Sequence, residues 1–407
     1  MNLCGISLRH SLPKLASVLR ATVAVTVVAG GAILSAARSI TREQLFFDPA
    51  EVPSLKYDNE IYSPEDVVAN TPKIDILAIN DEMRELVRIN TQDSSNAKTR
   101  LMSLHWAIKS PGNLGMQYDP FADGDAASTF RRGTANCLSY AHMFVSLARE
   151  AGLNAQYQWM EVRPEWHRIG ERVAVRLHVN VQVKMRDGSE FMVDIDPLNR
   201  SQVAGSKLIT DEEALGLYYN NLAMLSLTEE RPVYAWKQLI RGLNVAPTMS
   251  HLWVNLGAIY RLTGQYREAE QAYFRALDFD AGDRSAMNNL VVLYELEGRQ
   301  QEQEYWLDRL HRYRDLNPYY HANLGELALN QEDWTTAAKH FARAHRLHPD
   351  DSQIIYNMGL AEHHRGNDER ALELITEAIK VSAVTVEKER YRIQLRAIEQ
   401  SIEAAAL

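Results

Sequence analysis

A short pattern returns at a fixed interval through the second half of the chain. Each copy begins with an asparagine followed by an apolar residue, and successive copies lie 34 residues apart. The five asparagines are Asn221, Asn255, Asn289, Asn323 and Asn357. A period of this length is typical of supersecondary units that cannot bury their apolar faces alone and therefore stack on their neighbours. The period predicts an all-α solenoid of stacked units.

Alanines keep the same phase and define the repeat more closely. One register contains Ala269, Ala337 and Ala371. The pattern resembles the tetratricopeptide repeat, and the resemblance implies paired helices that bind a protein or peptide ligand. We expect about five repeats over residues 210–385, of which the first is degenerate and opens with a capping box of Thr210 and Glu213. Residues 386–407 are expected to form a last helix that covers the open end of the stack.

The recurrent asparagines have two interpretations. Asparagine is a poor helix former, so five in one register are not explained by helix propensity. They can hydrogen-bond across neighbouring repeats, or they can line the concave groove and hold the backbone of an extended peptide. In tetratricopeptide proteins this place resembles a ligand-facing one. Both interpretations stay open at this point, and all five asparagines are candidate peptide-groove residues.

The first half of the chain is organised around the stretch from Arg132 to Ala141, which contains Cys137. Cys4 is the only other cysteine in the sequence. An apolar stripe predicts a helix that begins at Cys137, and Gly152 predicts its end. The stripe consists of Leu138, Ala141, Phe144, Val145 and Ala148. The start of a helix favours an anion, and the nucleophilic form of cysteine is the thiolate, so Cys137 is a candidate nucleophile.

Antiparallel strands are predicted after this helix. Residues 155–162 favour one strand, and alternating apolar and polar residues over 173–185 predict a longer one that carries His178. Asp187-Gly188 then predicts a hairpin turn before a return strand over 191–195. With helices first and antiparallel strands after them, this half of the chain is predicted to be an α+β domain over residues 74–209.

The geometry of the hairpin decides whether an acid can reach the histidine. A two-residue turn would direct Asp194 and Asp196 away from the face of His178. A three-residue loop with a bulge at Gly188 would instead place Asp196 opposite His178 and Asp194 diagonal to it. A catalytic role for these residues therefore requires the three-residue loop.

Several motifs together resemble the transglutaminase-like superfamily over roughly residues 75–200. They are Arg132-Gly133, Asn136 to Ala141, Leu147 to Arg149, Gly152-Leu153, His178 and Val193 to Pro197. The resemblance implies a papain-related fold with a Cys-His-Asp triad, in which Cys137 is the nucleophile, His178 the base and Asp194 the orienting acid. The sequence departs from the family at Ala135, where members usually have glycine, and at Asn180, where an aromatic residue is common.

Other residues are alternatives for two of these roles. Asp196, which precedes Pro197, is a possible alternative acid. His167, in the loop before the long strand, is a reserve base. His142 lies five residues after Cys137 on the predicted helix and is expected to point away from it. The sequence contains no cofactor motif, and the histidines near residues 340–348 lack metal-ligand spacing, so neither a cofactor nor a metal is expected.

The resemblance implies acyl transfer on an amide or peptide bond, with the repeats recruiting a protein substrate or partner. The alternative is a catalytically inert scaffold that binds partners through the groove of the repeats. A net charge of −9 argues against a nucleic-acid partner.

The N-terminus has the features of a targeting segment. Three basic residues and no acids precede or border an apolar run over 21–34, and small residues follow it. We expect residues 1–37 to be a signal peptide or an N-terminal anchor, which would make the protein exported, periplasmic or otherwise extracytoplasmic, with a possible membrane tether. Residues 38–73, rich in proline, are expected to be an irregular linker that lies on the following domain.

Overall fold

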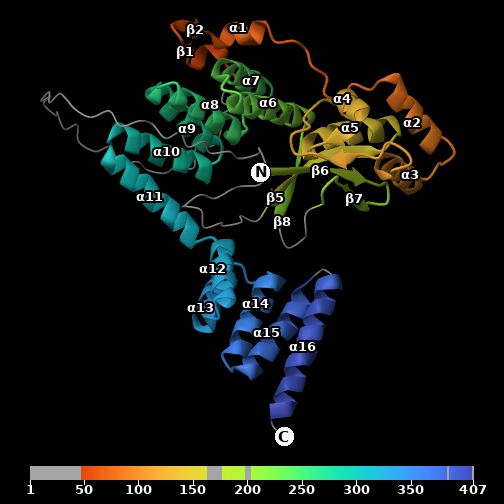
Figure 1. Ribbon diagram of the computed structural model, residues 1–407, viewed down its shortest axis with the longest axis vertical. Helices are drawn as coiled ribbons and strands as arrows, with labels where there is room; N and C mark the ends of the chain where they lie inside the picture. The colour runs from red at the N-terminus through yellow and green to blue at the C-terminus, as the bar shows by residue number, and fades with distance from the viewer. Residues whose placement is uncertain (1–46, 163–176, 198–202, 383–384, 406–407) are drawn as a thin grey trace, which may run out of the picture.

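The computed structural model describes residues 47–162, 177–197, 203–382 and 385–405. Helices and a small sheet make up the first half, and paired helices make up the second (Figure 1). The predicted fold class, an α+β domain followed by an all-α solenoid of paired helices, is confirmed. The predicted N-terminal targeting segment lies outside the described residues.

The first half contains short N-terminal elements, the strands, and three helices around α5, the helix that begins at Cys137. In chain order these are η2 (Pro49–Glu51), β1 (Leu55–Tyr57), β2 (Glu60–Tyr62), α1 (Pro64–Ala69), α2 (Asp81–Thr91), α3 (Ala97–Lys109), β3 (Gln117–Tyr118), α4 (Ala126–Arg132), β4 (Thr134–Ala135), α5 (Cys137–Glu150), β5 (Asn154–Val162), β6 (Leu177–Lys184), β7 (Glu190–Val193) and β8 (Val203–Ile209).

The main sheet is antiparallel, with strand order β7-β6-β5-β8. In the hairpin β6–β7, Val181 pairs with Val193 and Lys184 pairs with Glu190. Met185 and Ser189 close a three-residue loop, in which Gly188 has a φ of 84°. A left-handed φ of this kind is what a G1 bulge requires, so the three-residue loop predicted for a catalytic hairpin is confirmed.

Strand β8 and helix α4 are among the elements of this half that were not predicted from the sequence. Strand β8 pairs with β5 on the side opposite β6 and forms the second edge of the sheet. Helix α4 occupies a stretch for which the sequence predicted no element, and Asp125 caps it by accepting a hydrogen bond from the Ser128 N–H at 2.7 Å. Gly133, with a φ of 71°, ends α4 shortly before Cys137, where α5 begins.

Within the described residues, the second half consists of five helix pairs and a final helix. They are α6 (Asp211–Thr228) with α7 (Pro232–Val245), α8 (Ser250–Leu262) with α9 (Tyr266–Phe279), α10 (Arg284–Glu297) with α11 (Gln300–Asp315), α12 (Pro318–Asn330) with α13 (Trp334–Leu347), α14 (Ser352–His364) with α15 (Asp368–Val381), and α16 (Thr385–Ala405). Thr210 and Glu213 form the capping box predicted to open α6.

The segment before the first domain differs from its prediction. Instead of an irregular linker lying on the following domain, it holds the hairpin β1–β2 and the short helix α1, which pack on α7. Gln265 binds the segment at both ends of its amide: Nε2 donates to the Ser54 carbonyl at 3.0 Å, and Oε1 accepts from the Lys56 N–H at 2.8 Å. Leu55 is fully buried. These contacts hold the segment on the repeats, as Figure 1 shows near α7 and α8.

Buried apolar residues form two separate clusters. The first runs from Val52 to Trp306, so it includes the N-terminal segment, the α+β domain and the first three helix pairs. The second runs from Ala328 to Ile398. Helix α11 lies between them and has Trp306 as its buried residue. The α+β domain and the first repeats therefore share one core, whereas α12 to α16 have their own.

Candidate active site

Cys137 is the first residue of α5, the helix that packs between the other helices and the sheet. Asn136 caps this helix: its side chain accepts from the Ser139 N–H at 2.8 Å, and the Ser139 hydroxyl accepts from the Asn136 N–H at 3.0 Å. Because this capping box fixes where the helix starts, it places the half-buried Cys137 at the positive end of the helix dipole.

His178 and Asp194 form a buried pair on the adjacent strands β6 and β7. The distance from His178 Nε2 to Asp194 Oδ2 is 2.6 Å, and both side chains are almost completely buried. The register of the hairpin explains the contact, because Asp194 stands opposite Asn180 and diagonal to His178 when the pairing of Val181 with Val193 is continued by one residue. The structure thus brings together the histidine and the acid that the sequence proposed.

Electrostatics favour the protonated form of this histidine. Burial lowers the pKa of His178, but the hydrogen bond that its ring donates to Asp194, the hydrogen bond with the Cys137 side chain and the charges of both groups raise it to about 9. Since Nε2 contacts Asp194, Nδ1 is the ring nitrogen that remains for the thiol. An imidazolium held between a carboxylate and a thiol is the arrangement that stabilises a thiolate.

Asp196, the alternative acid, takes a different position. Its backbone N–H donates to the second carboxylate oxygen of Asp194, Oδ1, at 3.1 Å. The side chain of Asp196 is half-exposed, whereas Asp194 is buried. Lys109 on α3 donates to the carbonyl of Ile195 at 2.8 Å, between the two acids. Asp194 is therefore the acid in contact with His178, and the backbone around it is fixed by its neighbours.

A loop over residues 119–125 lies against the start of α5, and the sequence did not indicate it as part of the site. Its central carbonyl, at Ala122, accepts hydrogen bonds from the Asn136 N–H at 3.1 Å, the Ser139 hydroxyl at 2.7 Å and Arg132 Nη2 at 2.9 Å. Arg132 also donates to the carbonyls of Asp123 and Thr134. Arg132 and Asn136 belonged to the recognised motif, and that was the only sequence signal for this network.

His142, the other candidate histidine among the described residues, packs away from the pair. His142 is buried on α5, where its Nδ1 lies 2.8 Å from the Tyr157 hydroxyl, so it faces β5 as a structural residue. Burial lowers the pKa of His142 to about 3, which keeps it neutral. His167, the reserve base, lies outside the described residues.

The recurrent asparagines do not share one role. Asn255 Nδ2 donates to Asn220 Oδ1 at 2.6 Å, and Asn357 Nδ2 donates to Glu326 Oε1 at 3.1 Å; both contacts join neighbouring repeats. Asn289 bonds the Ser285 carbonyl of its own helix.

The two remaining asparagines of the register differ again. The Oδ1 atom of Asn323 is buried without a hydrogen-bond partner among the described residues. The side chain of Asn221 lies against Asp123 of the first domain. Bonding across repeats accounts for Asn255 and Asn357, and a peptide-groove role for any of the five stays a prediction.

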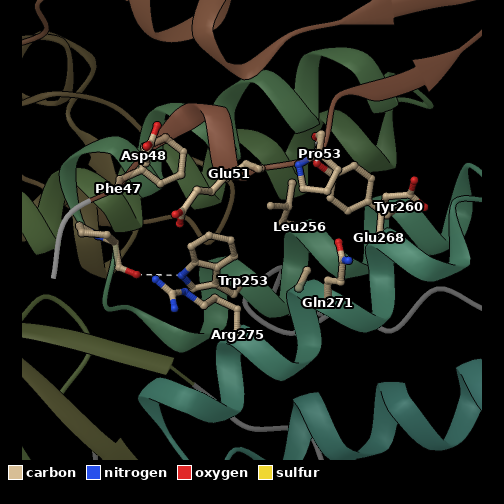
Figure 2. Close-up of a pocket in the computed structure, with 13 residues that line it drawn as sticks. Phe47, Asp48, Glu51, Pro53, Trp253, Leu256, Tyr260, Glu268, Gln271 and Arg275 are labelled. Carbon is tan, nitrogen blue, oxygen red and sulfur yellow. Dashed lines mark hydrogen bonds between the residues drawn. The ribbon is translucent and has the colours of Figure 1, made fainter. Parts of the chain in front are cut away.

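A cavity lies between the N-terminal segment and the pair α8–α9, away from the Cys-His-Asp residues. Figure 2 shows Phe47, Glu51 and Pro53 on one side of it and Trp253 and Arg275 on the other. Tyr260 donates a hydrogen bond to the Pro53 carbonyl at its edge. Because the chain's own N-terminal segment forms one wall, this cavity belongs to the contact between the segment and the repeats.

Two further properties hold across the described ranges. They contain no cluster of three or more histidine, cysteine or acidic side chains suited to a metal ion. No helix within them has the length and apolar character needed to cross a membrane. The apolar run over 21–34 lies outside these ranges.

Comparisons with known proteins assign both halves of the chain. Residues 81–197 match the transglutaminase-like superfamily, and residues 252–285 and 323–383 match tetratricopeptide repeat models. No curated protein sequence matches the chain.

Among solved structures, the chain is similar to YrrB, a TPR protein with an unusual peptide-binding site, at 19% identity over 45% of this chain and 93% of that one, with a TM-score of 0.23. It is also similar to PilF of Pseudomonas aeruginosa, at 16% identity over 48% of this chain and 90% of that one, with a TM-score of 0.25. MamA of Desulfovibrio magneticus RS-1 is 14% identical over 42% of this chain and 96% of that one, with a TM-score of 0.24. The chain carries a transglutaminase-like core domain followed by tetratricopeptide repeats, which indicate a role in protein interaction.

Proposed function

We propose that this protein is a transglutaminase-like cysteine hydrolase or acyltransferase that acts on an amide or peptide bond. The observation that carries the proposal is the buried contact of 2.6 Å between His178 Nε2 and Asp194 Oδ2, beside a thiol at the first residue of a helix. A buried ion pair is costly unless it is well paired, so an arrangement that keeps an imidazolium next to a cysteine supports a chemical role.

The proposed reaction follows from these positions. The Cys137 thiolate attacks the amide carbonyl, and His178 gives its proton to the departing amine as the C–N bond breaks, which leaves a thioester. Water or a second amine then attacks the thioester, transfers its proton to His178 and releases Cys137. The backbone N–H of Cys137 provides one donor for the developing oxyanion, because it belongs to the first turn of α5.

The repeats supply the recruitment part of the proposal. Tetratricopeptide repeats bind protein or peptide ligands, so a protein substrate or an assembly partner would bind there and be held near the thiol. We further propose that the protein is exported and works outside the cytoplasm, on the basis of the basic and apolar N-terminal sequence.

The experiment that tests the proposal is the alkylation rate of Cys137 against pH. The full chain carrying Cys4→Ser has Cys137 as its single thiol. The rate with iodoacetamide is compared between this protein and a variant that also carries His178→Ala. If His178 stabilises the Cys137 thiolate, alkylation should be fast at pH values well below 8.5, about the ordinary pKa of a thiol. The variant without His178 should lose this reactivity. The proposal is overturned if both proteins follow one ordinary thiol titration or if Cys137 does not react.

A further inference from the structure

The 119–125 loop lies between the nucleophile and the first repeat helix. Toward the nucleophile, the Ala122 carbonyl accepts from the backbone of Asn136 and from the Ser139 hydroxyl, the two residues of the capping box. Arg132 holds the loop from a third direction through the carbonyls of Ala122 and Asp123. A shift of this loop would therefore move the hydrogen bonds that define the start of α5.

On its other side the same loop meets the repeats. The Asp123 carboxylate has the side-chain amides of Asn136 and Asn221 beside it. Its Oδ1 accepts from the Gly124 N–H at 3.1 Å. Its Oδ2 is buried, and no donor among the described residues meets it with good hydrogen-bond geometry. Burial raises the pKa of Asp123 to about 6, against the lowering effect of these donors and of Arg132. A buried carboxyl group of this kind depends on the amides around it.

The neighbouring turn of α6 faces the same region. Tyr218, three residues before Asn221, meets the His142 ring of α5 edge to face, at 6.0 Å between centroids and 78° between planes. The charges of Asp123 and Asp125 both act on Tyr218. Tyr218 and Asn221, which lie one turn apart on the same face of α6, therefore contact α5 and the 119–125 loop respectively. The Arg149–Asp211 ion pair, with atoms 2.6 Å apart, joins the far end of α5 to the start of α6.

We propose that Asn221 is a positioning residue for Cys137, acting through the Asp123 carboxylate and the Asn136 cap. The inference rests on the proposed function, because it concerns the reactivity of the same thiol. It assigns the first asparagine of the repeat register to the active site rather than to the ligand groove. The reactivity of Cys137 then depends on the first repeat helix, and not only on the transglutaminase-like domain.

The test uses Asn221→Ala in the full Cys4→Ser chain, with Asn289→Ala as the matched control. Asn289 holds the same place in its repeat but bonds only its own helix among the contacts described. We expect Asn221→Ala to lower the alkylation rate of Cys137 at pH 7 by about threefold or more, since a charge-assisted hydrogen bond is lost. The midpoint of its rate–pH profile should also rise. Asn289→Ala should leave both quantities unchanged.

A double-mutant cycle separates a shared route from two independent effects. If Asn221 acts through Asp123, then Asp123→Asn and Asn221→Ala combined should lower the rate no further than the stronger single change. Additive losses, or an Asn221→Ala profile that matches the parent, would overturn the inference. If the parent itself lacks a poised thiol when compared with His178→Ala, the proposed function and this inference fall together. If the parent has the reactive thiol and Asn221→Ala keeps the same rate–pH profile, only this inference is overturned.

Discussion

Asp194 is the residue whose replacement separates the two candidate acids most directly. It contacts His178 through Oδ2, while its Oδ1 accepts from the backbone of Asp196. Both acids stand on the same strand end, but only Asp194 is buried against the imidazole. A charge-assisted hydrogen bond contributes more in a buried site than at the surface. Replacing Asp194 should therefore reduce the reactivity of Cys137 much more than replacing Asp196.

Asp194→Asn should therefore slow alkylation of Cys137 at pH 7 by roughly tenfold or more, because hydrogen bonds to charged groups contribute about 1.5–3 kcal/mol. Asp196→Asn is the matched control and should change the rate by no more than about twofold. The measurement is the rate with iodoacetamide in the single-thiol chain. A larger loss in Asp196→Asn than in Asp194→Asn would contradict this assignment of the acid.

The raised pKa of His178 also predicts how stability depends on pH. The pKa of its imidazole is about 9 in the folded protein and 6.5 in an unfolded chain. A raised pKa means that the folded state binds the proton more tightly, so this contribution is complete below pH 6.5 and is lost as the pH rises through about 9. The Tm difference between the parent and His178→Ala should be larger at pH 6 than at pH 9.5. A difference that stays constant or grows would count against the ion pair.

The three candidate catalytic residues could be predicted from the sequence, but the residues that hold them in position could not. Cys137, His178 and Asp194 were identified from a motif and a strand pattern, while the choice between Asp194 and Asp196 depended on one residue of hairpin register. Asp123 and its contact with Asn221 were missed because the contact joins two domains. No local periodicity indicates which residues meet across such an interface.

Within the elements, the repeat glycines determine how closely paired helices approach. A Cβ atom built on Gly257 would lie 2.5 Å from Cε1 of Tyr273, a buried aromatic residue of the partner helix α9. Gly325 has the same relation to Phe341 two repeats later. The glycine and the ring therefore form a single packing unit, and an added methyl group must displace a fully buried side chain.

Gly257→Ala should destabilise the protein by about 1–3 kcal/mol, the usual cost of overpacking a buried contact. Gly112→Ala is the control, because a Cβ there meets no atom within 4 Å. Thermal unfolding of the two variants is compared with that of the parent. Equal Tm values for Gly257→Ala and Gly112→Ala would show that Tyr273 can move aside at little cost.

Elements with strong periodicity were predicted more successfully than short ones. The 34-residue period indicated the helical solenoid, and alternation over the long strand indicated β6. Strand β8 was missed because Gly205 and Ser206 interrupt its apolar residues, and its position is set by pairing with β5. Helix α4 was missed because seven residues are too few for a clear helical period.

On the scale of the whole molecule, the two cores divide the chain at a different place from the domain boundary. The first core joins the transglutaminase-like domain to the repeats as far as Trp306, and the second holds α12 to α16. Leu316, at the end of α11, is 63% exposed, which fits the thin packing between the two cores. Figure 1 shows α12 to α16 as a group beyond α11.

Phe341→Ala should weaken the second core and leave the first intact. Phe341 is fully buried, and truncation of a buried phenylalanine costs about 3–5 kcal/mol. We expect a partial unfolding transition at a lower temperature than the unfolding of the parent. At temperatures below this transition, the alkylation rate of Cys137 should be the same as in the parent. Trp236→Ala, in the first core, is the comparison and should change that rate. A single cooperative transition in Phe341→Ala, or a changed rate, would mean that the cores unfold together.

The contact of the N-terminal segment with Gln265 has a consequence for the order in which the protein can fold. Lys56 and Gln265 are 209 residues apart in sequence. At an elongation rate of about 5–20 residues per second, the ribosome adds the second partner roughly 10–40 s after the first. Until then the segment lacks this contact, and the short β1–β2 hairpin is too small to be stable alone. The earliest described part of the chain therefore cannot complete its native contacts until synthesis has reached Gln265.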